Sequence, residues 1–186
     1  MGGLLAACFT EKYPDLVKRL ILFAPPGYPL SGAKLTLAFA KSSFGGFVWR
    51  RLISPYMASE KGLQFNIKMA FHDPKGHPQE TTELKELTRK MWSHHHPSYY
   101  MEIMLRTIRD FDMLHQEHVY RAIGKHPRPV LLIWGTADKS VAYQCAKRMV
   151  ADLPQVEFRA IEKAGHIAIL EYASLVNNWV LEFLKR

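Results

Sequence analysis

Cysteine is scarce in this sequence, and several features that would define a special class of protein are missing. The 186 residues include only two cysteines, Cys8 and Cys145, so a disulfide framework is excluded and we expect two reduced thiols in the core. No apolar run is long enough to form a transmembrane helix, and the first residues lack the basic leader of a signal peptide. We expect a cytoplasmic protein.

Long basic runs are missing as well, although the formal net charge is +8. Lysine and arginine are scattered along the chain, with doublets at Lys18-Arg19 and Arg50-Arg51, so we expect no nucleic-acid partner. The sequence contains no internal repeat or low-complexity tract. A composition that is 48% hydrophobic is typical of a globular chain with a substantial core.

The clearest positive signal is the stretch from Val130 to Asp138. Residues 130–134 are all apolar, in a run that is too short for a membrane span and too continuous for a half-exposed strand. This pattern predicts a strand buried on both faces, as in a parallel sheet. Gly135 is expected to let the backbone turn at the end of the strand. Asp138 follows just past that end, where reactive side chains gather in open parallel sheets.

A second strand is predicted over residues 156–161, and it leads to His166. Apolar residues between the two strands recur at helical spacing, which predicts a strand–helix–strand unit with both strand ends at one sheet edge. We therefore predict that the Asp138 carboxylate lies about 2.6–3.2 Å from one ring nitrogen of His166, as the base and its orienting acid do in nucleophilic catalysis. The alternative is that Asp138 caps the following helix and that His166 is an ordinary loop residue.

The beginning of the chain predicts a helix and then a strand. Residues 1–9 are mostly small and apolar, which would let a helix press closely against a sheet. Residues 16–23 contain an apolar run that predicts a buried strand, and the sequence around Pro25 and Gly27 predicts the turn that follows it.

The middle of the chain favours helices. Residues 83–92 predict an amphipathic helix, and Pro97 predicts the start of another. The expected apolar face of that second helix comprises Tyr100, Met104, Ile108 and Phe111. An aromatic-rich segment precedes both helices, and we interpret most of its rings as the core of this region: Phe39, Phe44, Phe47 and Trp49.

Three adjacent histidines, His94, His95 and His96, resemble a metal site. Neighbouring residues on a helix point about 100° apart, so three in a row cannot all face one ion. We therefore expect no metal site, and we expect little effect from replacing His95.

Taken together, these features resemble the C-terminal part of an α/β-hydrolase. Met1-Gly2-Gly3 resembles the end of a Gly-x-Ser-Met-Gly-Gly elbow, and residues 16–26 resemble the sixth strand of that fold. Residues 130–138 resemble the seventh strand with its acid. Gly165-His166 resembles the histidine loop, and residues 174–186 resemble the closing helix. The resemblance implies a partial α/β-hydrolase fold, with a mostly parallel sheet, flanking helices and a helical cap insertion. It implies core segments at 1–29 and 116–186 and a cap or lid at 30–115.

The resemblance also implies a mechanism. The nucleophilic serine would fall immediately before Met1, so it is absent from this chain, which we interpret as a fragment. His166 would be the general base, Asp138 its orienting acid, and the backbone N–H of Met1 an oxyanion donor. The implied activity of the full-length protein is hydrolysis of a small apolar carboxylic ester, without metal or cofactor.

Several alternatives stay open. An epoxide hydrolase, a dehalogenase, a carbon–carbon hydrolase and an aminopeptidase would share the fold with an esterase. A truncated, non-catalytic chain or a binding module would have no activity. A genuinely short protein with different packing is a further alternative to a fragment.

Overall fold

The computed structural model describes residues 1–29, 33–94 and 97–186. The chain divides into two compact units. Unit 1 comprises Met1–Tyr28, Met69–Asp73 and Met113–Arg186, and unit 2 comprises Pro29–Lys68 and Pro74–Asp112.

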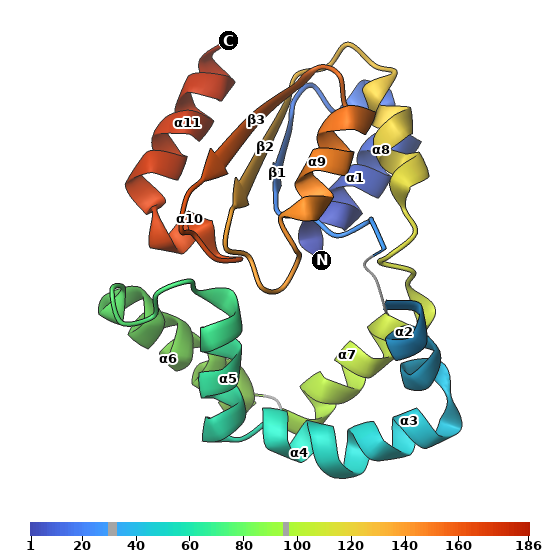
Figure 1. Ribbon diagram of the computed structural model, residues 1–186, viewed down its shortest axis with the longest axis vertical. Helices are drawn as coiled ribbons and strands as arrows, with labels where there is room; N and C mark the ends of the chain where they lie inside the picture. The colour runs from blue at the N-terminus through green and yellow to red at the C-terminus, as the bar shows by residue number, and fades with distance from the viewer. Residues whose placement is uncertain (30–32, 95–96) are drawn as a thin grey trace. The chain divides into compact units, whose positions relative to one another are not determined.

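A three-stranded parallel sheet forms the centre of unit 1. Its strands are β1 (Leu20–Phe23), β2 (Val130–Gly135) and β3 (Val156–Ile161), in that spatial order (Figure 1). All six residues of β2 are buried, as expected for the central strand of a sheet covered on both faces. The third strand has its predicted bounds, and the second runs one residue beyond its predicted end, to Gly135.

The predicted bounds of the first strand were wrong at its amino end. Pro14–Leu16 form a 3-10 helix, η1, and the strand begins only at Leu20. The fixed φ angle of Pro14 suits the first position of a helical turn, and Leu16 is left 72% exposed. The apolar run at residues 16–23 is therefore longer than the strand, because only residues 20–23 pair with β2.

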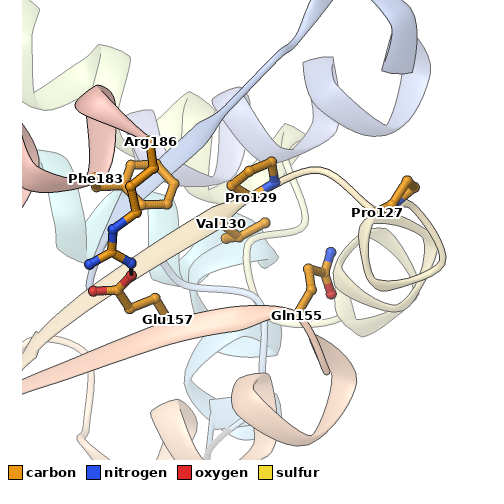
Figure 2. A pocket seen from close by; sticks show the side chains of 7 residues that line it. All are labelled: Pro127, Pro129, Val130, Gln155, Glu157, Phe183 and Arg186. Atoms are coloured by element: carbon orange, nitrogen blue, oxygen red, sulfur yellow. Dashed lines mark hydrogen bonds and ion pairs between the residues drawn. The ribbon is translucent and has the colours of Figure 1, made fainter.

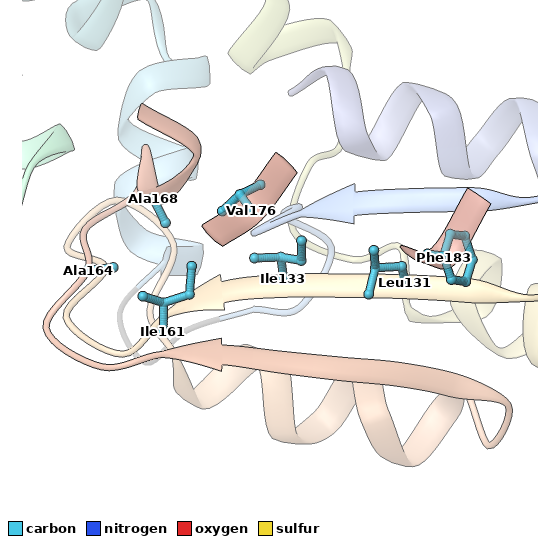
Figure 3. Packing of buried hydrophobic residues seen from close by; sticks show 7 residues of the cluster. All are labelled: Leu131, Ile133, Ile161, Ala164, Ala168, Val176 and Phe183. Carbon is cyan, nitrogen blue, oxygen red and sulfur yellow. The ribbon is translucent and has the colours of Figure 1, made fainter. Parts of the chain in front are cut away.

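One face of the sheet packs on the C-terminal helices α10 (Ala168–Glu171) and α11 (Ala173–Lys185). Figure 3 shows this cluster, in which strand residues Leu131, Ile133 and Ile161 pack with Val176 and Phe183 of α11. The closing helix expected at residues 174–186 is thus confirmed. Burial of this apolar surface is what holds α11 on the sheet.

Helices α1 (Gly2–Lys12), α8 (Glu117–Gly124) and α9 (Gln144–Asp152) lie on the other face (Figure 1). The close approach predicted for the small residues of α1 is confirmed at Gly3, where an added Cβ would lie 3.0 Å from the Cβ of Pro25. Leu4 and Ala7 of the same helix are fully buried. The first turn of α1 therefore packs beside the carboxyl end of β1.

The described residues of unit 2 form helices joined by turns, and none of them lies in a strand. Its helices are α2 (Ala33–Lys41), α3 (Ser43–Val48), the π-helical turn η2 (Trp49–Ile53), α4 (Ser54–Met57), α5 (Glu60–Ala70, whose last two residues belong to unit 1), α6 (Pro78–His94) and α7 (Pro97–Asp110). Long-range hydrogen bonds tie them together: the Trp49 indole donates to the Met101 carbonyl at 3.0 Å, and the Arg109 guanidinium donates to the carbonyls of Ala40 and Ser42, each at 2.8 Å.

Two interpretations of the middle segment were wrong. Phe39, Phe44 and Phe47 are 42%, 68% and 60% exposed, so these rings do not form the core of this unit. The apolar face of α7 is also displaced by one residue, because Met101 and Leu105 are buried whereas Tyr100 is 41% exposed. The two predicted helices themselves, α6 and α7, are confirmed.

The two cysteines lie on helices, as expected, and both are free thiols, but only Cys145 lies in the core, whereas Cys8 is partly exposed. Burial raises the pKa of Cys145 above the usual thiol value, and it does the same for Cys8. Neither thiol is thereby favoured as a nucleophile. Among residues 1–29, 33–94 and 97–186, no helix is long and apolar enough to cross a membrane.

Candidate active site

Asp138 and His166 meet at the carboxyl edge of the sheet. Asp138 follows β2 and His166 follows β3, and Oδ2 of Asp138 lies 2.8 Å from Nδ1 of His166, within the predicted range. The Asp138 side chain is fully buried, whereas that of His166 is 30% exposed. The pair therefore has one buried member and one that solvent or a substrate can reach.

The other oxygen of Asp138 shapes its own loop. Oδ1 accepts from the backbone N–H groups of Ser140 and Val141, each at 2.8 Å. Helix α9 begins only at Gln144, so Asp138 stabilises the turn before the helix. The two interpretations of this residue, as a local cap and as the partner of His166, describe different oxygens of one carboxylate.

This geometry determines the tautomer of a neutral His166. A carboxylate oxygen can only accept, so Nδ1 of His166 carries the proton and donates it to Asp138. Nε2 is then left with a free lone pair. Such a nitrogen can take a proton from a nucleophile and later return it to a leaving group.

The two loops that carry the pair are bound directly to each other. The N–H of Ala137 donates to the Ala164 carbonyl at 3.0 Å, and the N–H of Thr136 donates to Ile161 at 2.9 Å. Gly135 has no room for a side chain, because an added Cβ would collide with the carbonyl oxygens of Ala164 and Gly165. The chain turns directly after Gly135, as expected, but the φ angle of Gly135 is not positive, and close approach of the loops is what requires glycine here.

Trp134 supports the acid loop from inside the sheet. Its side chain is fully buried, and the indole N–H donates to the Val141 carbonyl at 3.1 Å. The turn is therefore held by Asp138, through the N–H groups of Ser140 and Val141, and by Trp134 of β2, through the Val141 carbonyl. The sequence around Trp134 predicts only an apolar strand residue, and nothing in it indicates this contact.

A buried carboxylate on the far side of the histidine loop was also missed. Glu171 is 6% exposed and accepts hydrogen bonds from the backbone N–H groups of Gly165 and His72. An acidic residue inside the apolar run Ile167 to Tyr172 is the sequence signal that could have revealed it.

Met1 is the N-cap residue of α1, and its backbone carbonyl accepts from the N–H groups of Leu4 and Leu5. Figure 1 marks the N-terminus on the side where β1 and β2 end, and the packing of Gly3 on Pro25 places it there as well. Ser42 and Ser140 have local roles: Ser42 caps α3, and the Ser140 hydroxyl donates to the Met69 carbonyl at 3.4 Å.

Metal ligands do not cluster in the part of the chain that the structure describes, where no group of three or more His, Cys, Asp or Glu side chains could hold an ion. Of the histidine triplet, His95 and His96 lie outside the described residues.

A cavity of about 320 Å³ lies at the opposite ends of the strands (Figure 2). It is lined by Val130, the first residue of β2, and by Phe183 near the end of α11, with the Glu157–Arg186 ion pair at its side. Because Asp138 follows the other end of β2, this cavity is separate from the acid–histidine pair.

Comparison with curated proteins identifies hydrolases. The uncharacterized hydrolase YugF of Bacillus subtilis (strain 168) is 23% identical over 195 residues, which cover 100% of this chain and 63% of YugF. A 2-hydroxy-6-oxononadienedioate/2-hydroxy-6-oxononatrienedioate hydrolase of Burkholderia vietnamiensis (strain G4 / LMG 22486) is 25% identical over 197 residues, covering 100% of this chain and 60% of that protein. The chain thus spans about three fifths of the length of these relatives.

Solved structures show the same fold. A thermophilic esterase from Thermogutta terrifontis, with malate bound, has a TM-score of 0.70 at 20% identity, and the match covers 99% of this chain and 61% of the esterase. The sequence profile of the alpha/beta hydrolase fold matches residues 1–173. With its parallel sheet and flanking helices, the chain belongs to the alpha/beta hydrolase family, as its sequence motifs predict.

Proposed function

We propose that the whole protein is a serine-dependent hydrolase of carboxylic esters, in which His166 is the general base and Asp138 orients it. The observation that supports this proposal most directly is the 2.8 Å contact between Oδ2 of Asp138 and Nδ1 of His166. It leaves Nε2 of His166 unprotonated in the neutral ring, on a side chain that is partly exposed.

In the proposed reaction a serine hydroxyl loses its proton to Nε2 of His166 while its oxygen bonds to the ester carbonyl carbon. The tetrahedral intermediate then collapses, its bond to the alkoxy oxygen breaks, and His166 returns the proton to the departing alcohol. Water repeats both steps and releases the acid. Asp138 stabilises the imidazolium that forms transiently in each half of the reaction.

We place the nucleophile directly before Met1 in the longer protein. Met1-Gly2-Gly3 resembles the end of a serine elbow, and the helix that follows begins at the same sheet edge as Asp138 and His166. In that arrangement the backbone N–H of Met1 would donate to the oxyanion. No metal or organic cofactor has a role in this chemistry.

We propose unit 2 as a cap for an apolar substrate. Its segment from Ala33 to Met57 exposes large apolar side chains, including Phe44 at 68% and Leu52 at 66%. Apolar surfaces of this kind suit an acyl or aromatic substrate group.

A fluorophosphonate probe combined with an ester series tests the proposal. The whole protein should become covalently labelled, and it should hydrolyse p-nitrophenyl butyrate faster than p-nitrophenyl esters of charged acids. The 186-residue chain alone should do neither. Absence of both labelling and ester hydrolysis in the folded whole protein would contradict serine esterase chemistry.

Carbon–carbon hydrolysis is the second candidate, and the name of the Burkholderia relative supports it. The same pair could serve it, because His166 would protonate a carbon leaving group in place of an alkoxide. Turnover of 2-hydroxy-6-oxononadienedioate, followed by loss of its conjugated absorbance, would favour this reaction if p-nitrophenyl esters react more slowly.

A further inference from the structure

Glu171 binds two segments of unit 1 that are far apart in the sequence. Its Oε1 accepts from the backbone N–H of His72 at 2.7 Å, and its Oε2 accepts from the backbone N–H of Gly165, the residue before His166. The residue is only 6% exposed. A buried carboxylate is expensive unless it is well hydrogen-bonded, so these two donors are strong constraints on both segments.

The partner of the histidine loop is the short segment Met69–Asp73, which interrupts the sequence of unit 2 but packs in unit 1. Three further contacts hold it there. The N–H of Ile167 donates to the Ala70 carbonyl at 3.2 Å, and Phe71 is fully buried. An added Cβ at Gly165 would collide with the backbone of Ala70 and His72.

The same segment also reaches the acid loop. The hydroxyl of Ser140 donates to the Met69 carbonyl at 3.4 Å, and Ser140 donates its N–H to Asp138. Segment 69–73 therefore touches both loops that carry the acid–histidine pair. Among the bonds that segment 69–73 itself makes to the histidine loop and α10, the one from His72 to Glu171 has a charged acceptor, and the same carboxylate binds Gly165 next to His166.

We infer that Glu171 is a positioning residue that clamps segment 69–73 to the histidine loop and so holds the His166 ring in line with Asp138. Glu171 bonds to the backbone of His72 and Gly165, and its carboxylate is not the group that orients the imidazole directly. Its effect on turnover rests on the proposed function, whereas its effect on loop order does not.

The informative change is Glu171→Gln, which keeps the size of the side chain. A glutamine oxygen can still accept one N–H, but its NH₂ group cannot accept the other, so one arm of the clamp is lost. Glu182→Gln is the matched control, since it removes the same charge from an exposed position on α11. If Glu171→Gln does not fold, Glu171→Asp keeps the charge but is one methylene too short to reach both segments.

Amide hydrogen exchange and proton NMR of the whole protein test the clamp without catalysis. In Glu171→Gln we expect exchange at Gly165 or His72 to accelerate about tenfold or more, while amides of β2 keep their rates. The downfield Nδ1 proton of His166, identified by its loss in His166→Ala, should broaden. Unchanged exchange at both amides, or equal acceleration throughout the core, would overturn the inference.

Turnover provides the second measurement. In Glu171→Gln, kcat should fall about tenfold or more with KM within about twofold, because a misaligned base slows the chemical step more than binding. Glu182→Gln should match the parent protein. A Glu171→Gln protein with faster exchange at Gly165 but unchanged kcat would refute the positioning role of Glu171. A parent protein that is inactive toward every ester would refute the proposed function instead. In that case the exchange measurement alone would decide whether Glu171 clamps the two segments.

Discussion

Asp138 has a different task on each of its carboxylate oxygens. One oxygen accepts two backbone N–H groups of the turn, and the other accepts from His166. Because the Asp138 side chain is fully buried, water does not compete for its two carboxylate oxygens. The turn therefore holds the carboxylate that contacts the imidazole.

Replacing Asp138 by asparagine should separate these two tasks. The amide oxygen can still accept from Ser140 and Val141, so the variant should fold with a modest loss of thermal stability. Its NH₂ group would face Nδ1 of His166 and favour the wrong tautomer, so kcat of the whole protein should fall by about 10⁴. Steady-state kinetics and a thermal melt measure the two effects. Asp15→Asn, at an exposed site, is the control, and equal activity of both variants would contradict the role of Asp138.

Gly135 makes a second prediction at this scale. An alanine methyl at this position would collide with carbonyl oxygens of the histidine loop, and backbone atoms cannot move aside cheaply. Gly135→Ala should lower the free energy of unfolding by about 1–3 kcal/mol. At Gly2 an added Cβ meets nothing within 4 Å, so Gly2→Ala in α1 should be neutral or slightly stabilising. Chemical denaturation compares them, and equal stability would show that the loops are not closely packed at Gly135.

Strand β3 and helix α11 share an ionic cluster. The guanidinium of Arg159 donates to Glu157 and lowers the pKa of that carboxyl, and Arg186 adds a second contact at 2.6 Å. Arg159 also lies over the Trp179 ring of α11, 5.4 Å from its centroid. The cluster thus links an edge strand to the helix that covers it.

The lowered pKa of Glu157 predicts a pH-dependent contribution to stability. A depressed carboxyl pKa stabilises the fold above the unfolded-state pKa, and this stabilisation is lost as the pH falls through the folded-state value. Glu157→Gln should therefore reduce the free energy of unfolding by about 0.2–1 kcal/mol at pH 7, and by less at pH 3. Denaturant melts at both pH values measure this difference. A larger loss at pH 3 than at pH 7 would have the wrong sign.

Elements with strong local patterns could be predicted from the sequence. The run at residues 130–134 and the strand–helix–strand topology were sufficient to bring Asp138 and His166 together. The start of β1 and the buried face of α7 were not predictable in this way, because the elements that pack against them decide both. Leu20 is the first residue of β1 that pairs with β2. Met101 of α7 is buried, and its backbone carbonyl accepts from the Trp49 indole.

The site could be predicted only as far as its two strand ends. Glu171 depends on the segment 69–73, which is distant in sequence and has no motif. The exposed rings of unit 2 were misread for a related reason, since aromatic content alone does not distinguish a core from a surface that contacts something else.

At the scale of the whole molecule, α1 presents an unusual apolar stripe. Leu5 and Phe9, four residues apart on one side of the helix, are 53% and 49% exposed, and Tyr13 directly after the helix is 42% exposed. Exposed stripes of this kind favour association.

We therefore expect the 186-residue chain to self-associate at micromolar concentration, and we expect the double change Leu5→Gln and Phe9→Gln to reduce this. Sedimentation velocity measures the effect. Leu4→Gln is the control, because Leu4 is fully buried and its replacement should unfold the chain without any gain in solubility. A monodisperse parent chain with a sharp, reversible melt would refute the prediction.

We propose above all that His166 is the base of a hydrolase. The activity of the whole protein with His166 replaced by alanine tests this most directly. In His166→Ala, kcat/KM for ester hydrolysis should fall by about 10⁴ or more while the thermal melt stays close to that of the parent, because His166 is partly exposed and contributes little to the core. His126→Ala, at an exposed position before β2, should keep full activity. If a folded His166→Ala protein hydrolysed esters at near the parent rate, His166 would not be the base of this hydrolase.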